Sequence, residues 1–266
     1  MNVINKKKEK LIKKKKKQEK TERKDKEIER KEQEINIKEE ETERKKEVKT
    51  ENQNYDLQMN ALFRSISNNY IFFITLFYCL YKFKQNPKYK SSYIQLLFSF
   101  ITVSITGYFV HFISHHINFT NYHKENKNIL TMNSYTNYII KFICNFFDFH
   151  DITHHDTSIN KQILNIIYEF FNNVVMQGLG LVIFIKMLDL RVVLLWAFMY
   201  ATIHNINYLF IKPSTHRDHH INNKTNYGID YCDILFNTKY EWNDIETHNH
   251  GAINLLVVTY IIMYFT

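Results

Sequence analysis

The sequence predicts an all-α integral membrane protein with about four transmembrane helices arranged in two hairpins. Three observations lead to this fold class. Only five glycines and two prolines occur in 266 residues, so few positions break helices. Long apolar stretches with little or no charge recur after residue 68. Charged residues concentrate in the first 50 positions, which separates a polar tail from an apolar body.

The tail is assigned to residues 1–55. Residues 1–50 contain 20 lysines and arginines against 13 aspartates and glutamates, a net charge of +7, and no aromatic residue. Such a composition favours disorder or a fluctuating polar helix. The run LIKKKKK at 11–17 is the candidate for contact with anionic lipid. Nucleic acid is not an expected partner, because the rest of the chain is nearly neutral and the high pI describes the tail alone.

The body, residues 56–266, contains four long apolar stretches and a shorter one that closes the chain. The second stretch carries no lysine, arginine, aspartate or glutamate over about 22 positions, the length that a bilayer crossing needs. Asp189 and Arg191 mark a turn between the third and the fourth. We expect the first four stretches to form two membrane hairpins. In order, the five lie at 69–84, 92–113, 163–188, 190–211 and 252–265.

A soluble all-helical protein with buried helices is the alternative fold. Against it, several long segments are apolar on all faces, and the chain has 21 phenylalanines and 18 tyrosines. Tryptophan and tyrosine near the segment ends are typical of the membrane interface. The composition therefore favours the membrane protein.

All 13 histidines lie between residues 111 and 250, and most fall into three groups. Residues i, i+3 and i+4 of a helix share one face, so each group aims two or three imidazoles at one point. Neutral imidazole is a common ligand for Fe, Zn, Cu and Ni, and the groups hold more ligands than one metal ion takes. The groups are HFISHH (His111, His115, His116), HDITHH (His150, His154, His155) and HRDHH (His216, His219, His220).

These histidines therefore predict a site for two metal ions. His204, near the end of an apolar helix and twelve positions before His216, is included as a ligand. The absence of H-E-x-x-H and of paired cysteines argues against a metalloprotease or a structural zinc site. His123, His248 and His250 are interpreted as ordinary core residues.

A shared metal site fixes the expected topology. The 33 residues between His116 and His150 are too few for two membrane crossings, so these two groups lie on one side. The hairpin at 163–211 returns the chain to that side before His216. The tail lies there too, and its positive charge places tail and metal site in the cytosol, although four lysines at 82–90 would then face the lumen.

The sequence resembles the membrane fatty acid hydroxylase / sterol desaturase superfamily over roughly residues 90–240. HFISHH, HDITHH, IHNINY and HRDHHINNKTNYGIDYCDILFNT carry the resemblance. The most specific part is Asn226-Tyr227-Gly228 followed by Asp233–Thr238, where the family typically has Asn-Tyr-Gly and Asp-x-x-Phe-Gly-Thr types. Asn237 stands where the family usually has glycine.

This resemblance implies a non-haem di-iron centre in a cytosolic helical domain that caps the membrane hairpins. It implies O2-dependent hydroxylation or desaturation of a sterol, sphingoid or fatty acyl lipid, with electrons from NAD(P)H through a cytochrome b5 type donor. The endoplasmic reticulum is the expected location. Asp151, Asp156 and Asp218 are candidates for holding ligand imidazoles through Nδ1–H, or are solvated loop residues.

 The substrate class, and the choice between hydroxylation and desaturation, stay open at this point.

Three alternatives accompany this reading. A histidine-box desaturase of the plasmanyl-lipid type also spaces its histidine groups widely, but its last group lacks the Asn-Tyr-Gly signature. A non-catalytic membrane protein could keep the histidines for metal binding or as a scaffold. In the third, the basic tail is the functional part and the body is its anchor.

Overall fold

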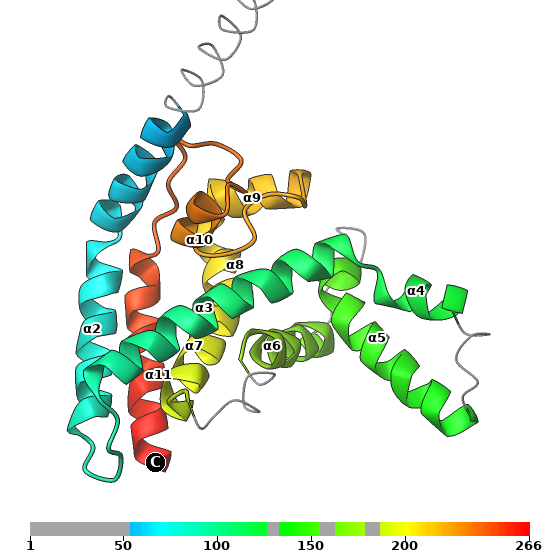
Figure 1. Ribbon diagram of the computed structural model, residues 1–266, viewed down its shortest axis with the longest axis horizontal. Helices are drawn as coiled ribbons and strands as arrows, with labels where there is room; N and C mark the ends of the chain where they lie inside the picture. Colours follow the sequence, from blue (N-terminus) through cyan, green and yellow to red (C-terminus); the bar gives the residue numbers. More distant parts are fainter. Residues whose placement is uncertain (1–53, 127–132, 155–162, 179–186) are drawn as a thin grey trace, which may run out of the picture. The chain divides into compact units, whose positions relative to one another are not determined.

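The computed structural model describes residues 54–126, 133–154, 163–178 and 187–266, without the side chains of 150–154. The chain divides into two units, 1–57 and 58–266, and the charged tail lies almost entirely outside the described residues. Within the described ranges every regular element is a helix and there is no strand, which confirms the predicted all-α class (Figure 1).

The first predicted hairpin consists of α2 (Tyr70–Gln85) and α3 (Tyr93–His116). Pro87 lies in the connection, and the Ser92 side chain accepts a hydrogen bond from the amide of Gln95 at the start of α3. With this cap and a single glycine along its length, α3 continues for 24 residues. It therefore extends beyond the apolar stretch and carries His111 and His115 on its last turns.

Three helices follow α3. They are α4 (Phe119–Asn126), α5 (Ser134–His154) and α6 (Ile163–Gln177). The amides of Phe119 and Thr120 at the start of α4 donate to the buried carboxylate of Asp148 on α5. These two hydrogen bonds cap the start of α4 and connect it to α5, and α5 in turn contacts α3 and α6.

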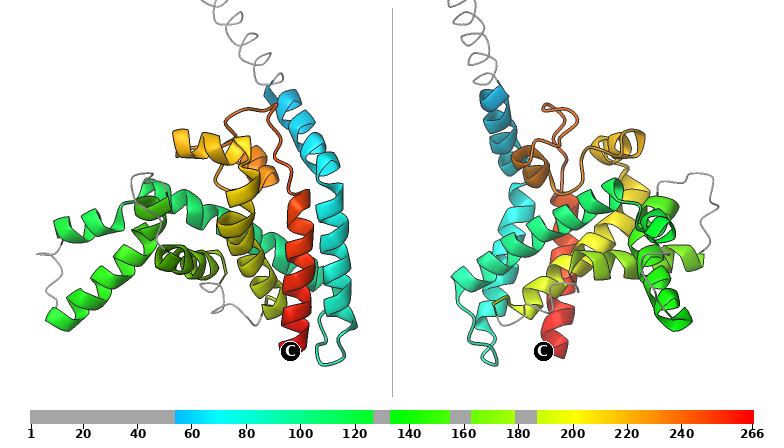
Figure 2. Two further views of the ribbon diagram at one scale, coloured as in Figure 1. Left: turned by 180° about the vertical axis from the view of Figure 1, so that it is seen from behind. Right: turned by 45° about the vertical axis from the view of Figure 1, so that its right-hand side comes forward.

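The next continuous helical stretch is α7 (Leu190–Thr202), a π-helical turn η2 (Ile203–Asn207) and α8 (Tyr208–Ile211). It ends at Lys212, whose positive φ of 49° precedes Pro213 and turns the chain into α9 (Ser214–Ile221). After α10 (Asp230–Leu235) and the short η3 (Asn249–Gly251), α11 (Ala252–Phe265) packs between α2 and α7, contacting both (Figures 1 and 2).

Among the described residues, two helices are long and apolar enough to cross a membrane, namely Tyr93–His116 and Leu190–Ile211. Of the other two predicted spans, α2 has 16 residues and α6 has 15, whereas a crossing takes about 20. Residues 179–186 of the predicted third span lie outside the described residues. The structure thus shows two candidate membrane helices, and the four-span arrangement goes beyond it.

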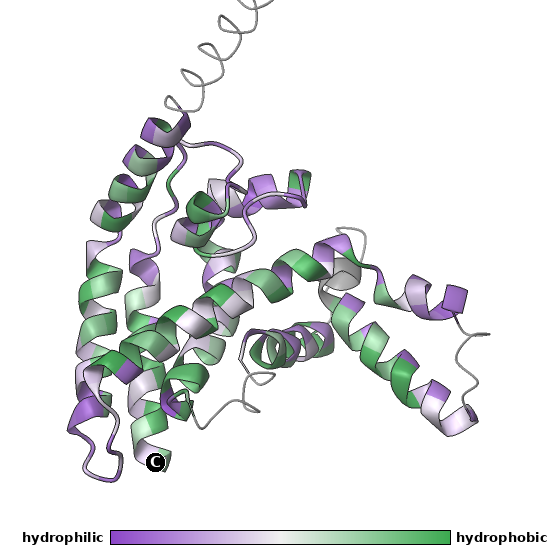
Figure 3. Ribbon diagram, viewed as in Figure 1, coloured by the Kyte–Doolittle hydropathy of each residue, from purple (hydrophilic) through white to green (hydrophobic). Residues whose placement is uncertain are grey.

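Hydrophobic side chains cover much of the outside of these helices. Figure 3 shows hydrophobic residues along most of α3 and α11 and hydrophilic residues on α9. On the described surface, Ile94 of α3 and Ile253 and Tyr264 of α11 are exposed large hydrophobic residues. Exposed apolar surface of this extent is typical of a face that contacts lipid or another protein.

The turns of the two predicted hairpins contact each other at the end away from the histidines. Arg191 is buried and forms two hydrogen bonds with the Asp189 carboxylate, at 3.0 and 2.6 Å. It also donates to the carbonyl of Phe83 at 2.7 Å and lies over the Tyr89 ring. This buried ion pair therefore links the start of α7 to the α2–α3 connection.

We expect Arg191→Met to lower the free energy of unfolding by about 3–5 kcal/mol, because it leaves the Asp189 carboxylate buried without its charged partner. Thermal or denaturant unfolding of the protein in detergent measures the change. Arg217→Met is the matched control, since Arg217 is exposed and lies 3.9 Å from Asp218, and it should change stability by less than about 1 kcal/mol. Equal stabilities of the two variants would contradict a stabilising role for the buried pair of Arg191 and Asp189.

Candidate metal centre

Three histidines from two distant segments come together at the end of α3. His111 and His115 are one helical turn apart, and their Nε2 atoms lie 3.0 Å from each other. The buried His219 of α9 places its ring 5.0 Å from that of His111 and 4.8 Å from that of His115. One ligand nitrogen from each of the three lies within 4.8 Å of the others, so the triad could hold a metal ion.

Backbone carbonyls orient two of these imidazoles. Nδ1 of His219 donates to the carbonyl of Thr225 at 2.6 Å, and Nδ1 of His111 donates to the carbonyl of Tyr227. Metal-binding histidines commonly use one ring nitrogen in this way, which fixes the tautomer and presents the other nitrogen to the metal. The arrangement suits Nε2 coordination by both residues.

Burial also keeps His219 in the form that binds metals. Desolvation lowers its pKa to about 4, and His220 contributes in the same direction, while the hydrogen bond to Thr225 opposes the shift. The imidazole is therefore neutral at physiological pH, as coordination requires.

We expect metal occupancy to persist as the pH falls from about 8 to about 6 and to be lost toward about pH 4. The folded pKa of His219 is below its usual value near 6.5, so between these values the unfolded chain binds more protons than the folded one. The free energy of unfolding is therefore highest above about pH 6.5, and it decreases as the pH falls from about 6.5 to about 4. Metal content after dialysis at each pH measures the effect. Release centred near pH 6.5 would indicate exposed ligands instead.

A second group contains His204, His216 and His220. Nε2 of His216 lies 3.1 Å from Nε2 of His220, and the His204 and His216 rings are 4.8 Å apart. His219 lies between the two groups, since its ring is 6.4 Å from that of His216 and 6.1 Å from that of His220. Six of the described histidines thus lie in two neighbouring sets, and the triad of His111, His115 and His219 is the one whose ligand nitrogens all lie within 4.8 Å of one another.

The π-helical turn η2 positions His204. Such turns are rare and occur often at functional sites, because they rotate side chains relative to a regular helix. The Thr202 hydroxyl and the Asn205 side-chain amide hydrogen-bond to carbonyls of the preceding turn, which stabilises the distortion. His204 stacks on Tyr200 with a ring separation of 5.5 Å. Together with the turn at Lys212 and Pro213, this geometry brings His204 to His216.

The Asn-Tyr-Gly segment is hydrogen-bonded to the Asp233–Thr238 segment, which begins on the last turn of α10 and continues into the following loop. The buried Asp233 carboxylate accepts from the amides of Tyr227 at 2.8 Å and Gly228 at 3.1 Å, and from the Thr238 hydroxyl at 2.9 Å. Asn226 bonds back to the carbonyl of Thr215 on α9. The loop therefore fixes the carbonyls of Thr225 and Tyr227 that orient the two imidazoles.

The asparagine at 237 has a conformational explanation. Asn237 has φ of 57° and Asn226 has φ of 54°, both in the left-handed region. Glycine adopts this region most readily, and asparagine is among the residues that tolerate it best. Asparagine can consequently replace the glycine usual in the resembled motif without a change of backbone.

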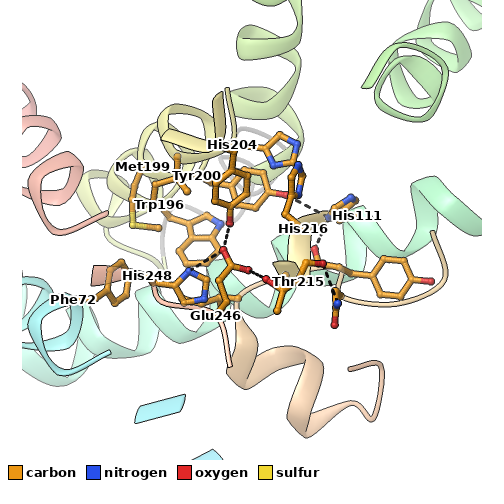
Figure 4. A pocket seen from close by; sticks show the side chains of 16 residues that line it. Phe72, His111, Trp196, Met199, Tyr200, His204, Thr215, His216, Glu246 and His248 are labelled. Carbon is orange, nitrogen blue, oxygen red and sulfur yellow. Dashed lines mark hydrogen bonds and ion pairs between the residues drawn. The ribbon is translucent and has the colours of Figure 1, made fainter. Parts of the chain in front are cut away.

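Glu246 is a site residue that the sequence did not indicate. Its buried carboxylate accepts hydrogen bonds from the hydroxyls of Tyr208 and Thr215, and it lies 3.7 Å from Nδ1 of His248. Figure 4 shows Glu246 in the same pocket as His111, His204 and His216. A lone glutamate 26 positions after His220 has no motif around it, so only the fold reveals this placement.

The ten predicted ligands have different outcomes. Six are brought together, as described above. His116 is exposed, its Nδ1 bonds to the carbonyl of Phe112 at 2.8 Å, and it does not join the triad. Asp218 faces Arg217 at 3.9 Å. His155 and Asp156, and the side chains of His150, Asp151 and His154, lie outside the described residues.

We expect His116→Ala to retain most of the bound metal and His115→Ala to lose it, because only His115 faces His111 and His219. Metal analysis of the two purified variants compares neighbouring positions with the same substitution. Metal loss from His116→Ala with retention in His115→Ala would show that the first group coordinates in another arrangement.

The three histidines interpreted as core residues have other surroundings. His123 is buried with Nε2 2.9 Å from Oδ1 of Asn137. His248 lies beside Glu246, and His250 lies 3.0 Å from the side-chain amide of Asn207.

Comparison with models of known families, with curated proteins and with solved structures gives no match, so the functional argument rests on the residues themselves.

Proposed function

We propose that this chain is a membrane-bound lipid oxidoreductase in which the histidine groups hold two iron ions. The observation that carries the proposal is the triad of His111, His115 and His219, in which two imidazoles are oriented by backbone carbonyls and which lies at the end of the long apolar helix α3. The motifs that resemble the fatty acid hydroxylase / sterol desaturase superfamily contribute both sets. A lipid is the substrate class that such a location favours.

The donor set fits this group. His111, His115 and His219 would hold one ion, and His204, His216 and His220 would contribute to the second, with His150, His154 and His155 as the further ligands that the sequence predicts. When bound, iron would supply O2 activation, with two electrons from a cytochrome b5 type donor. One oxygen atom enters a C–H bond in hydroxylation, and both leave as water in desaturation.

The protein's own groups would orient and shield the site. The loop around Asp233 holds the carbonyl acceptors of His111 and His219. Tyr200 and Tyr208 lie against His204 and His216, and their rings would shield the site on that side. The location that fits this arrangement is the cytosolic face of the endoplasmic reticulum, with the basic tail on the same side.

Lipid analysis under isotopically labelled O2 tests the proposal. Cells that express the full chain, and matched cells that express His219→Ala, are compared for lipids that gain labelled oxygen or a double bond. A labelled lipid supports hydroxylation, and an unlabelled unsaturated product supports desaturation. Bound metal without lipid change or O2 uptake would overturn the enzyme assignment in favour of a non-catalytic metal protein.

A further inference from the structure

Helix α6 is polar on its inner side and apolar on its outer side. Ile163 and Leu164 are 76 % and 70 % exposed, whereas Asn172 and Asn173 are 1 % and 3 % exposed. Glu169 and Gln177 are also buried. Burying amide side chains costs free energy unless they are hydrogen-bonded, so their inward orientation indicates a role inside the protein.

An apolar cavity of about 660 Å³ lies between α3, α5 and α6. Its walls include Val110, Phe146 and Met176, while Phe142 and Ile143 at its edge are exposed side chains. The volume is within the range of small-molecule sites, and the apolar lining suits a hydrocarbon. An exposed apolar edge would let a lipid enter from the membrane.

A much smaller space of about 10 Å³ lies between this cavity and the metal centre. It shares Val110, Met176 and Gln177 with the apolar cavity, and it is also lined by His111 and Tyr200. Its remaining polar lining includes Asn172 and Asn173. A space of this size accommodates about one water-sized group.

Two buried polar atoms at this space have no hydrogen-bond partner within the described part of the chain, Oδ1 of Asn172 and Nδ2 of Asn173. The orientation of the Asn172 amide is set, because its Nδ2 donates to the carbonyl of Phe146 at 2.8 Å. Two residues that line a space for about one oxygen atom thus offer one acceptor and one donor between them.

We propose that Asn172 and Asn173 bind the hydroxyl group of a lipid whose hydrocarbon part occupies the apolar cavity. A hydroxyl can donate to Oδ1 of Asn172 and accept from Nδ2 of Asn173 at the same time. A carboxylate fits poorly, since it cannot donate and no lysine or arginine is among the described residues lining either space. This inference rests on the proposed function and narrows its substrate to a lipid alcohol oxidised near its hydroxyl.

Asn173→Leu in the full-length protein tests the inference by binding. The substitution keeps the side-chain size and removes the donor, so affinity for a radiolabelled long-chain primary alcohol should fall about tenfold, the effect of one neutral hydrogen bond. Affinity for the alkane of equal chain length should not fall. A steroid alcohol and its deoxy analogue form a second arm, which distinguishes the two sources of a lipid hydroxyl.

Two further variants separate the hydroxyl from the hydrocarbon. Asn145→Leu makes the same change at an exposed position of α5 and should alter neither affinity. Ile143→Trp at the cavity edge should weaken alcohol and alkane binding by similar factors, and it keeps the test decisive if Asn173→Leu does not fold. Equal effects of Asn173→Leu on alcohol and alkane, or no effect of Ile143→Trp, would overturn the inference.

The same assay on His219→Ala distinguishes this inference from the proposed function. Binding does not require the metal centre, so the variant should retain the preference for the alcohol. Alcohol binding that depends on Asn173, without any oxidised product from the wild-type chain, would support the binding site and contradict the enzyme. Oxidation of a lipid without a hydroxyl, with no binding of either alcohol, would support the enzyme and contradict the binding site.

Discussion

Replacing His219 with alanine should remove bound metal and reduce product formation by more than about 100-fold. His219 is the buried imidazole that faces both histidine sets, and even an outer partner of a metal ligand typically accounts for 10–100-fold in affinity or activity. Metal content per chain and lipid product yield are the two measurements. The wild-type chain should carry about two iron ions.

His123→Ala is the matched control for this experiment. His123 is also a buried histidine, but it lies on α4 and contacts Asn137 rather than the metal centre. It should keep its metal even if its stability falls. Full metal content in His219→Ala would contradict the centre described here, and metal loss in both variants would point to a general loss of folding.

Replacing Asp233 with alanine should lower the free energy of unfolding by about 3 kcal/mol or more and weaken metal binding by about 10–100-fold. The change leaves two amide donors and one hydroxyl without their buried acceptor, and each such loss costs about 1–3 kcal/mol. The loop then no longer holds the carbonyls of Thr225 and Tyr227, which orient His219 and His111. Thermal unfolding and metal titration measure the two effects.

Asp244→Ala provides the comparison. Asp244 is half-buried and accepts a hydrogen bond from the Ser214 hydroxyl at 2.9 Å, so its loss should cost about 1 kcal/mol and leave metal affinity nearly unchanged. If Asp233→Ala and Asp244→Ala behave alike, the Asp233 loop does not support the ligands.

The sequence by itself determined the helical class and the local geometry of the histidine pairs. Scarce glycine and proline and long apolar stretches predict helices, and the described residues confirm them. The spacing i, i+4 placed His111 next to His115, and His216 next to His220, because residues one turn apart lie on the same face of a helix. These outcomes depend only on neighbours in the chain.

Only the tertiary structure decided which distant groups meet. Helix packing brings His219 between the two sets, turns His116 outward and places Glu246 beside Thr215 and Tyr208. It also directs Asn172 and Asn173 inward, although the sequence shows only an amide pair in an apolar segment. Spacing along a helix fixes the face on which a side chain lies, whereas the partner of that face depends on how separate helices pack.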